Sequence, residues 1–338
     1  MSSAKSALQE IDTDGKFVRT QSLLREKISP NHPVYQPEND RYHLYIALAC
    51  PWANRCYAVL KLKGLESCIG VSITHPTWQR TRPNDPDDSH CGWVFNTGVV
   101  ASPSGYGKFS NSNCTPDKVN NVASIRDLYE MCTDQKAKFT VPVLWDKKTS
   151  TIVNNESSEI LRMLTQEFDV FATGPYANLD LYPSHLRSAI DAENDWIYHD
   201  INDGVYKCGF AQTQESYDAA VNSLFTSLDR LESMLSKHRY VVGDTLTEAD
   251  IRLFMTLVRF DEVYVVYFKC NKKRIMDYPN IRQYVRDIYQ VPGVGDSIDI
   301  AAIKTHYYTS HPRLNYFAII PRGPDAVSDF VLPHDRDR

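Results

Sequence analysis

The pattern of apolar and polar positions changes from strand-like to helical near residue 50. Residues 42–48 alternate large apolar side chains with smaller or polar ones, which predicts a strand with two distinct faces. Pro51 then opens a segment with helical spacing that runs to Lys63 and meets Gly64, and proline fits the first helical position because its missing N–H is not needed there. The pattern therefore predicts a strand, a tight turn and a helix that begins at Cys50.

The rest of the first half predicts a mixed α/β domain. After the first strand and helix come a strand at 68–74, a long loop, a helix at 124–131, strands at 140–145 and 151–153, and a helix that starts near Ser157. This is the order of a thioredoxin-like domain, and Pro142, just inside a strand, is expected to follow a cis peptide bond. The connection over 75–120 is rich in Pro, Gly, Ser and Asn, and its length predicts a surface or functional insertion.

Long helices replace this pattern after Gly174. Residues 215–238 place apolar side chains three and four positions apart, as one buried stripe, and 247–250 form a capping box. We therefore expect an α/β thioredoxin-like N-terminal domain plus an all-α C-terminal domain. The predicted ranges are an N-terminal arm at 1–38, the thioredoxin-like domain at 39–173, the helical domain at 174–310 and a C-terminal tail at 311–338.

Composition narrows the possible partners. The 338 residues are 42% hydrophobic and carry a formal net charge of −5, so no basic surface is expected for nucleic acid or anionic lipid. No apolar run approaches the roughly 20 residues of a membrane-spanning helix, and the first residues lack the apolar core of a signal peptide. We expect no nucleic-acid or membrane partner and a cytoplasmic location, where the eight unclustered cysteines stay free and bind no metal.

Cys50 is the strongest candidate for chemistry. The first N–H groups of a helix and its dipole favour a thiolate, which is the reactive form of cysteine. The alternative is a small buried apolar residue, the usual fate of a free cysteine, and we assign that to Cys56, while the other six cysteines are interpreted as structural. Ala53 stands where a Cys-x-x-Cys pair would have its second thiol, so a redox cycle at Cys50 needs a thiol from elsewhere.

Two further segments predict a ligand site beside this thiol. Val141, before Pro142, either shapes a strand or presents its backbone to an extended peptide-like ligand. Glu156 and Ser157 open a helix; they either cap it or hold the ammonium and carboxylate of an amino-acid group. Together with Cys50, the second alternatives suit a γ-glutamyl tripeptide whose sulfur meets the thiolate.

Other candidates are less specific. Trp93 is either a loop anchor or an indole that lines the site. Lys138 is either a solvated charge or a cation for a ligand carboxylate. Four tyrosines of the second half are either packing residues or phenols that protonate an aromatic substrate, namely Tyr198, Tyr206, Tyr307 and Tyr308.

Six motifs resemble those of one family. They are Cys50-Pro51-Trp52-Ala53, Gly92-Trp93-Val94-Phe95, Val141-Pro142-Val143-Leu144-Trp145-Asp146, Asn154-Asn155-Glu156-Ser157-Ser158-Glu159, Gly204-Val205-Tyr206-Lys207 and His306-Tyr307-Tyr308-x-Ser310-His311. The chain resembles, from about residue 30 to 325, the Xi class of glutathione transferases, the glutathionyl-hydroquinone reductases.

The resemblance implies an enzyme with glutathione as co-substrate, glutathionylated aromatic quinols as partners and a homodimeric assembly. It implies that Cys50 is the nucleophile and that Trp93, Val141, Glu156 and Ser157 bind glutathione. It further implies that tyrosines face the quinol, with Tyr198 and Tyr307 as catalytic and Tyr206 and Tyr308 as substrate-binding residues.

One departure from the family concerns Lys138. The family usually has a Gly-Arg pair just before the Val-Pro strand, where this chain reads Ala137-Lys138-Phe139. Lysine keeps the charge but loses the bidentate fork of arginine, so glutathione-carboxylate binding is expected to be weaker or retuned.

The expected reaction is reduction of a glutathionyl-hydroquinone through a Cys50-glutathione mixed disulfide, from which a second glutathione releases glutathione disulfide. Two alternatives stay open: an Omega-like thioltransferase or dehydroascorbate reductase, and a non-catalytic module with a transferase fold that binds ligands.

Overall fold

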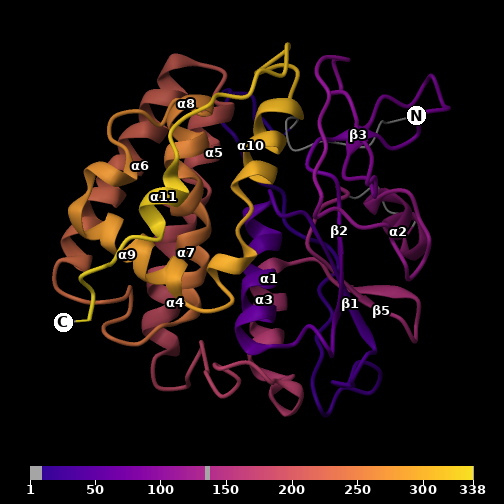
Figure 1. Ribbon diagram of the computed structural model, residues 1–338, viewed down its shortest axis with the longest axis horizontal. Helices are drawn as coiled ribbons and strands as arrows, with labels where there is room; N and C mark the ends of the chain where they lie inside the picture. Colours follow the sequence, from indigo (N-terminus) through magenta and orange to yellow (C-terminus); the bar gives the residue numbers. More distant parts are fainter. Residues whose placement is uncertain (1–9, 134–137, 338) are drawn as a thin grey trace. The chain divides into compact units, whose positions relative to one another are not determined.

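The computed structural model describes residues 10–133 and 138–337, which form two compact units (Figure 1). The described part of unit 1 consists of Gln21–Asn178 and Ser297–Pro321, and unit 2 of Glu10–Thr20, Leu179–Asp296 and the chain from Arg322 onward. Chain order alone assigned residues 297–310 to the helical domain because they are helical. Their contacts in the structure are with the α/β unit.

Unit 1 is built on a four-stranded mixed sheet in the order β2-β1-β5-β6. Strand β1 runs parallel to β2 and antiparallel to β5, and β5 runs antiparallel to β6. All five residues of β1 are buried, as expected of a central strand. The strands are β1 (Tyr42–Ile46), β2 (Gly70–Ile73), β5 (Val143–Asp146) and β6 (Thr151–Asn154), with a separate pair β3 (Gln79–Arg80) and β4 (Cys91–Gly92).

Helices α1 and α3 of unit 1 pack side by side next to this sheet (Figure 1). Helix α1 has Pro51 at its start and ends at Gly64, whose φ of +66° is the left-handed conformation that glycine adopts without strain. A Cβ at Gly64 would also lie 2.3 Å from the backbone nitrogen of Gly174. The helix therefore ends where two segments of the chain approach each other closely. The helices of unit 1 are α1 (Pro51–Lys63), α2 (Ile125–Cys132), α3 (Ser157–Gln166) and α10 (Ile300–Thr309), with a 3₁₀ turn at Asp169–Phe171.

Unit 2 is helical. Its longest helix is α6, whose predicted apolar stripe is buried, and the predicted capping box at Thr247 and Asp250 begins α7. The helices are α4 (Arg187–Trp196), α5 (Gly204–Phe210), α6 (Gln214–Leu235), α7 (Glu248–Arg259), α8 (Val265–Tyr267), α9 (Pro279–Gln290) and α11 (Ala326–Phe330). Single π-helical turns lie at Ile197–Asn202 and Phe260–Tyr264, and 3₁₀ turns at Ile275–Asp277 and, at the junction of the units, Gly295–Ser297.

These elements confirm the predicted fold class, an α/β thioredoxin-like domain plus an all-α domain. Within the described ranges, none of the helices has the length and apolar character needed to cross a membrane.

Candidate active site

Cys50 lies at the turn between β1 and α1, in an extended conformation immediately before the first helical residue. Its N–H donates to the Ala47 carbonyl at 3.0 Å, and its own carbonyl accepts the N–H of Asn54 at 2.8 Å, the first bond of the helix. The side chain is partly exposed. The strand, turn and helix predicted from the sequence therefore present a thiol at the positive end of a helix, where a thiolate is favoured.

Cys56 has the opposite environment. It is fully buried one and a half turns further along α1, and its thiol donates to the Ser157 carbonyl at 3.3 Å. Burial raises the pKa of the Cys56 thiol well above its ordinary value, so this sulfur stays protonated. The contrast between two thiols on one helix agrees with Cys50 as the reactive one.

Val141 faces the Cys50 sulfur across the start of β5. The Val141–Pro142 peptide bond is cis, as predicted. The Cys50 thiol donates to the Val141 carbonyl across 3.6 Å. The backbone of Val141 is therefore within reach of a peptide that brings its own sulfur to Cys50.

Glu156 and Ser157 open α3, as predicted. The Glu156 carboxylate caps the helix, accepting the Ser158 N–H at 3.1 Å and the Ser158 hydroxyl at 2.9 Å. Burial alone would raise the pKa of this carboxyl, but the nearby charge of Arg55 and the hydrogen bonds from Ser158 bring it below its ordinary value. Glu156 is thus a carboxylate at neutral pH that remains partly exposed, and capping does not preclude ligand binding.

Arg55 is a residue that the sequence analysis missed. It lies on α1, is 2% exposed, and donates to the Ser157 hydroxyl oxygen from Nε at 3.1 Å and from Nη2 at 2.5 Å. Its Nη2 is also 3.7 Å from Oε1 of Glu156. The available signal was a cation between Ala53 and Cys56 in the first half of a helix that packs in a core, because a buried charge requires an acceptor.

The N-terminal arm also reaches this corner. Residues 24–26 run antiparallel to the chain that leaves β6, with backbone bonds from Asn155 N–H to Leu24 O at 2.9 Å and from Glu26 N–H to Val153 O at 3.0 Å. The Ser22 hydroxyl lies 3.1 Å from Oε2 of Glu156. A segment predicted only to lie over the surface therefore extends the sheet edge and contacts a candidate ligand-binding carboxylate.

Trp93 follows β4 and is largely buried. Its ring stacks on His306 of α10 with centroids 4.5 Å apart and meets Trp78 edge-on at 5.6 Å. Its carbonyl accepts the Ile125 N–H at the start of α2. These contacts anchor Trp93 and connect it to the helix that carries Tyr307, and its contact with a ligand stays a prediction.

Lys138 is partly buried, and its carbonyl accepts the Thr140 N–H at 3.1 Å. Ala137, its neighbour in the Ala-Lys-Phe sequence, lies outside the described residues. The role of Lys138 stays a prediction.

The predicted tyrosines divide between the units. Tyr307 and Tyr308 lie on α10 in unit 1 and are 2% and 3% exposed. Unit 2 contains Tyr198, half-buried in a π-helical turn, and Tyr206 on α5. The Tyr206 ring is largely buried, with its centroid 5.4 Å from that of Phe268.

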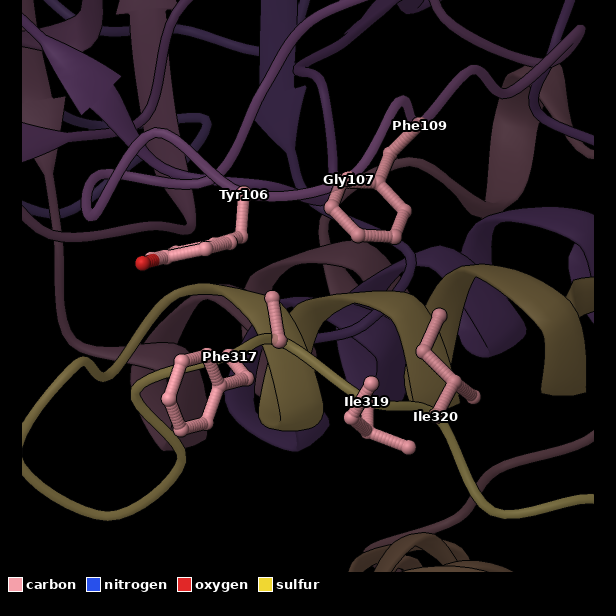
Figure 2. Close-up of a pocket in the computed structure, with 7 residues that line it drawn as sticks. Tyr106, Gly107, Phe109, Phe317, Ile319 and Ile320 are labelled. Carbon is pink, nitrogen blue, oxygen red and sulfur yellow. The ribbon is translucent and has the colours of Figure 1, made fainter.

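A groove of about 630 Å³ in unit 1 involves the long 75–120 connection (Figure 2). Tyr106 and Phe109 lie on one side, and Phe317, Ile319 and Ile320 of the segment after α10 lie on the other. The lining is apolar apart from the Tyr106 phenol. This surface can therefore bind an apolar group, and its lining residues include no thiol or carboxylate for covalent chemistry. Elsewhere in the described residues, no three His, Cys, Asp or Glu side chains gather as a metal site.

Comparisons with known proteins place this geometry in a family. The model of the glutathione S-transferase N-terminal domain matches residues 49–167, and that of the C-terminal domain matches residues 214–287. Together these matches cover more than half of the chain and define its class: both domains of a glutathione transferase are present, in the usual order.

Individual relatives narrow this class. The chain is 44% identical to glutathionyl-hydroquinone reductase YqjG of Escherichia coli, over 96% of this chain and 93% of that protein. A crystal structure of the Xi glutathione S-transferase from Phanerochaete chrysosporium has a TM-score of 0.84 and 46% identity, with 96% of this chain and 97% of the other covered. The glutathione-bound structure of E. coli YqjG has a TM-score of 0.82 and 43% identity, with 93% and 96% covered. The chain belongs to the Xi class of the glutathione transferase family.

Proposed function

We propose that this protein reduces glutathionyl-hydroquinones to hydroquinones, with glutathione as co-substrate and glutathione disulfide as second product. The observation that carries the proposal is the partly exposed Cys50 thiol at the start of α1, 3.6 Å from the Val141 carbonyl. It is supported by the E. coli relative that is itself named a glutathionyl-hydroquinone reductase.

Glutathione binds with its γ-glutamyl end at the start of α3. The Ser157 hydroxyl donates to the carboxylate, Glu156 accepts from the ammonium, and the peptide pairs with the backbone of Val141. Trp93 and Lys138 complete the glutathione site. This arrangement brings the ligand sulfur toward Cys50.

In the first step, the Cys50 thiolate attacks the sulfur that joins glutathione to the ring. A Cys50–glutathione disulfide forms, the carbon–sulfur bond breaks, and its electron pair stays with the ring carbon, which takes a proton. A phenol of Tyr198 or Tyr307 supplies that proton, and Tyr206 and Tyr308 contact the ring.

In the second step, another glutathione thiolate attacks the glutathione sulfur of the mixed disulfide. Glutathione disulfide leaves and Cys50 returns as thiolate, while the proton lost by the second thiol restores the tyrosine. Ala53 in place of a nearby thiol makes this second glutathione necessary. The sum is one substrate and one glutathione converted to one hydroquinone and one disulfide.

The test is chromatography of an anaerobic reaction with glutathione and glutathionyl-menadiol, the hydroquinone form of glutathionyl-menadione. Menadiol and glutathione disulfide should appear in equal amounts, through a mixed disulfide visible by mass spectrometry at Cys50. Absence of menadiol would refute the proposal.

A second candidate function is an Omega-like thioltransferase or dehydroascorbate reductase, because a relative from Schizosaccharomyces pombe, 44% identical over 92% of this chain, is named omega-like. Both functions use the same cysteine, so rates on dehydroascorbate and glutathionyl-menadiol measured side by side separate them. Failure to form any mixed disulfide would instead favour a non-catalytic ligand-binding module.

The proposal also includes a homodimer in the cytoplasm. Sedimentation of the full chain and fractionation of the cells that make it test these two points.

A further inference from the structure

Arg55 controls the direction of the Ser157 hydroxyl. A serine oxygen has two lone pairs and one hydrogen, and a guanidinium can only donate. Because Nε and Nη2 of Arg55 both donate to Ser157 Oγ, at 3.1 and 2.5 Å, they occupy its two lone pairs. The hydroxyl hydrogen must therefore point to a different acceptor, and the described residues supply none.

The backbone of Ser157 adds a second donor. Its N–H belongs to the first turn of α3, where no carbonyl of the same helix can accept it. The neighbouring Ser158 N–H is already satisfied by Glu156. Two donors of one residue, O–H and N–H, are thus directed to the start of α3, and a carboxylate is the acceptor that takes two parallel bonds.

The charge of Arg55 is itself arranged for a partner. The residue is 2% exposed, its Nη2 lies 3.7 Å from Glu156 Oε1, and its guanidinium carbon lies 5.0 Å from the centre of the Trp52 ring. Its Nη1 is buried and has no hydrogen-bond partner within the described part of the chain. A buried cation with an unsatisfied donor is costly, which is difficult to explain if Arg55 served only to join α1 to α3.

We propose that Arg55 is a positioning residue of the glutathione site, which orients the Ser157 hydroxyl toward the γ-glutamyl carboxylate. This inference rests on the proposed function. It adds that the preference for an amino-acid end group depends on α1, the helix of the nucleophile. The helix that begins at Cys50 therefore also orients the group that binds the γ-glutamyl end.

The test measures glutathione affinity by calorimetry in a Cys50→Ser background, where binding is seen without disulfide formation. Arg55→Lys keeps the charge but loses the fork, and Ser157→Ala removes the hydroxyl. Each should raise the Kd about tenfold, the loss expected for one charge-assisted hydrogen bond. The double variant should bind no more weakly than Ser157→Ala alone, because Arg55 acts through that hydroxyl.

Arg41→Lys is the matched control. Arg41 is another buried arginine of unit 1, with a bidentate bond to Asp146 at 2.7 and 2.8 Å. This substitution should lower the melting temperature and leave the Kd for glutathione unchanged. If Arg55→Lys behaves in the same way, or if its effect on Kd adds fully to that of Ser157→Ala, the inference is wrong.

If Arg55→Lys does not fold, a second set of variants tests the same inference. Arg55→Met with Glu156→Gln removes the buried charge together with its partner, and the same comparison with and without Ser157→Ala decides the result. Failure of the proposed function has a different signature: the protein with Cys50 and Arg55 intact would then form no menadiol, whatever the Kd values of the variants.

Discussion

Two regions of the molecule contain candidate site residues and differ in the kind of contact that holds their side chains. At the start of α3 in unit 1, Glu156 and Ser157 are held by directed hydrogen bonds from Arg55, Ser158 and Ser22. Around Tyr206 in unit 2 the contacts are ring against ring. Directed bonds select one arrangement of charges, whereas aromatic contacts tolerate rings of different outline.

One ion pair lies in this aromatic region. Arg19, from the N-terminal arm, lies 4.9 Å from the Tyr206 ring centre and binds Asp203 at 2.7 Å. Its charge is therefore paired with a carboxylate next to a packed ring. Under the proposed function, the comparison predicts that the start of α3 in unit 1 recognises the constant group, glutathione, and that the aromatic side chains around Tyr206 in unit 2 tolerate rings of different outline.

The largest effect is expected in unit 1, at Cys50. Cys50→Ala should lower turnover of glutathionyl-menadiol by at least about a thousandfold, because no other partly exposed thiol of the described residues lies at the N-terminal end of a helix. Cys56→Ala is the control on the same helix and should keep most of the activity. Equal losses in the two variants would remove the distinction between a reactive and a buried thiol.

The next largest effect concerns the tyrosines of unit 2. Tyr198→Phe should lower kcat about a hundredfold if this phenol donates the proton, as is typical of a lost general acid. Tyr206→Phe keeps the ring that packs against Phe268 and should change kcat less than about threefold. In neither variant should glutathione affinity change. If Tyr198→Phe is active and Tyr307→Phe is not, the proton comes from unit 1.

A smaller effect is expected for Glu156. Glu156→Gln should raise the Kd for glutathione about tenfold through loss of the ammonium contact, with kcat little changed. The pKa of Glu156 lies below its ordinary value of 4.5, so the unmodified site should keep its affinity as the pH falls from 7 to 5 and lose it only below that. An affinity already falling at pH 6 would contradict ionic recognition in unit 1. The effect should be the same for every quinol, unlike that of a substitution in unit 2.

The smallest effect is structural and lies in unit 2. Hydrogen bonds from Arg282 and Arg286 lower the pKa of Asp329 to about 2, against an ordinary 3.8. The native state therefore gains stability above pH 4 and loses it as the pH falls toward 2. Asp329→Asn should lower the melting temperature by about 2 to 4 °C at pH 7 and make no difference near pH 2. Calorimetric scans at the two pH values test this, with glutathione affinity as the unaffected control.

Local patterns were sufficient for most of the fold. The alternation over 42–48, Pro51 and Gly64 predicted β1 and α1, and the spacing over 215–238 predicted α6, because these signals act within one or two turns of chain. The order of elements then led to the thioredoxin-like domain and to the cis bond before Pro142. Cys50, Val141, Glu156 and Ser157 were predicted as site residues in the same way, since each stands at or near an element boundary.

Contacts between distant parts of the chain could not be predicted from these local patterns. Helix α10 was assigned to the helical half by its spacing, but the stacking of His306 on Trp93 joins it to the α/β unit. Helical periodicity shows which face of a helix is buried and says nothing about which partner buries it.

By itself, the sequence determined the elements, the fold class and the thiol at a helix start, because propensity, capping and periodicity are local. Only the tertiary structure showed that Arg55 donates to Ser157, 102 positions away, and that Ser22 of the arm contacts Glu156, 134 positions away. Such pairs depend on how strands and helices pack, and the free energy of burying a charge is decided by the partner that packing supplies. The sequence thus predicted the nucleophile, and the folded structure showed which side chains contact the groups proposed to bind its ligand.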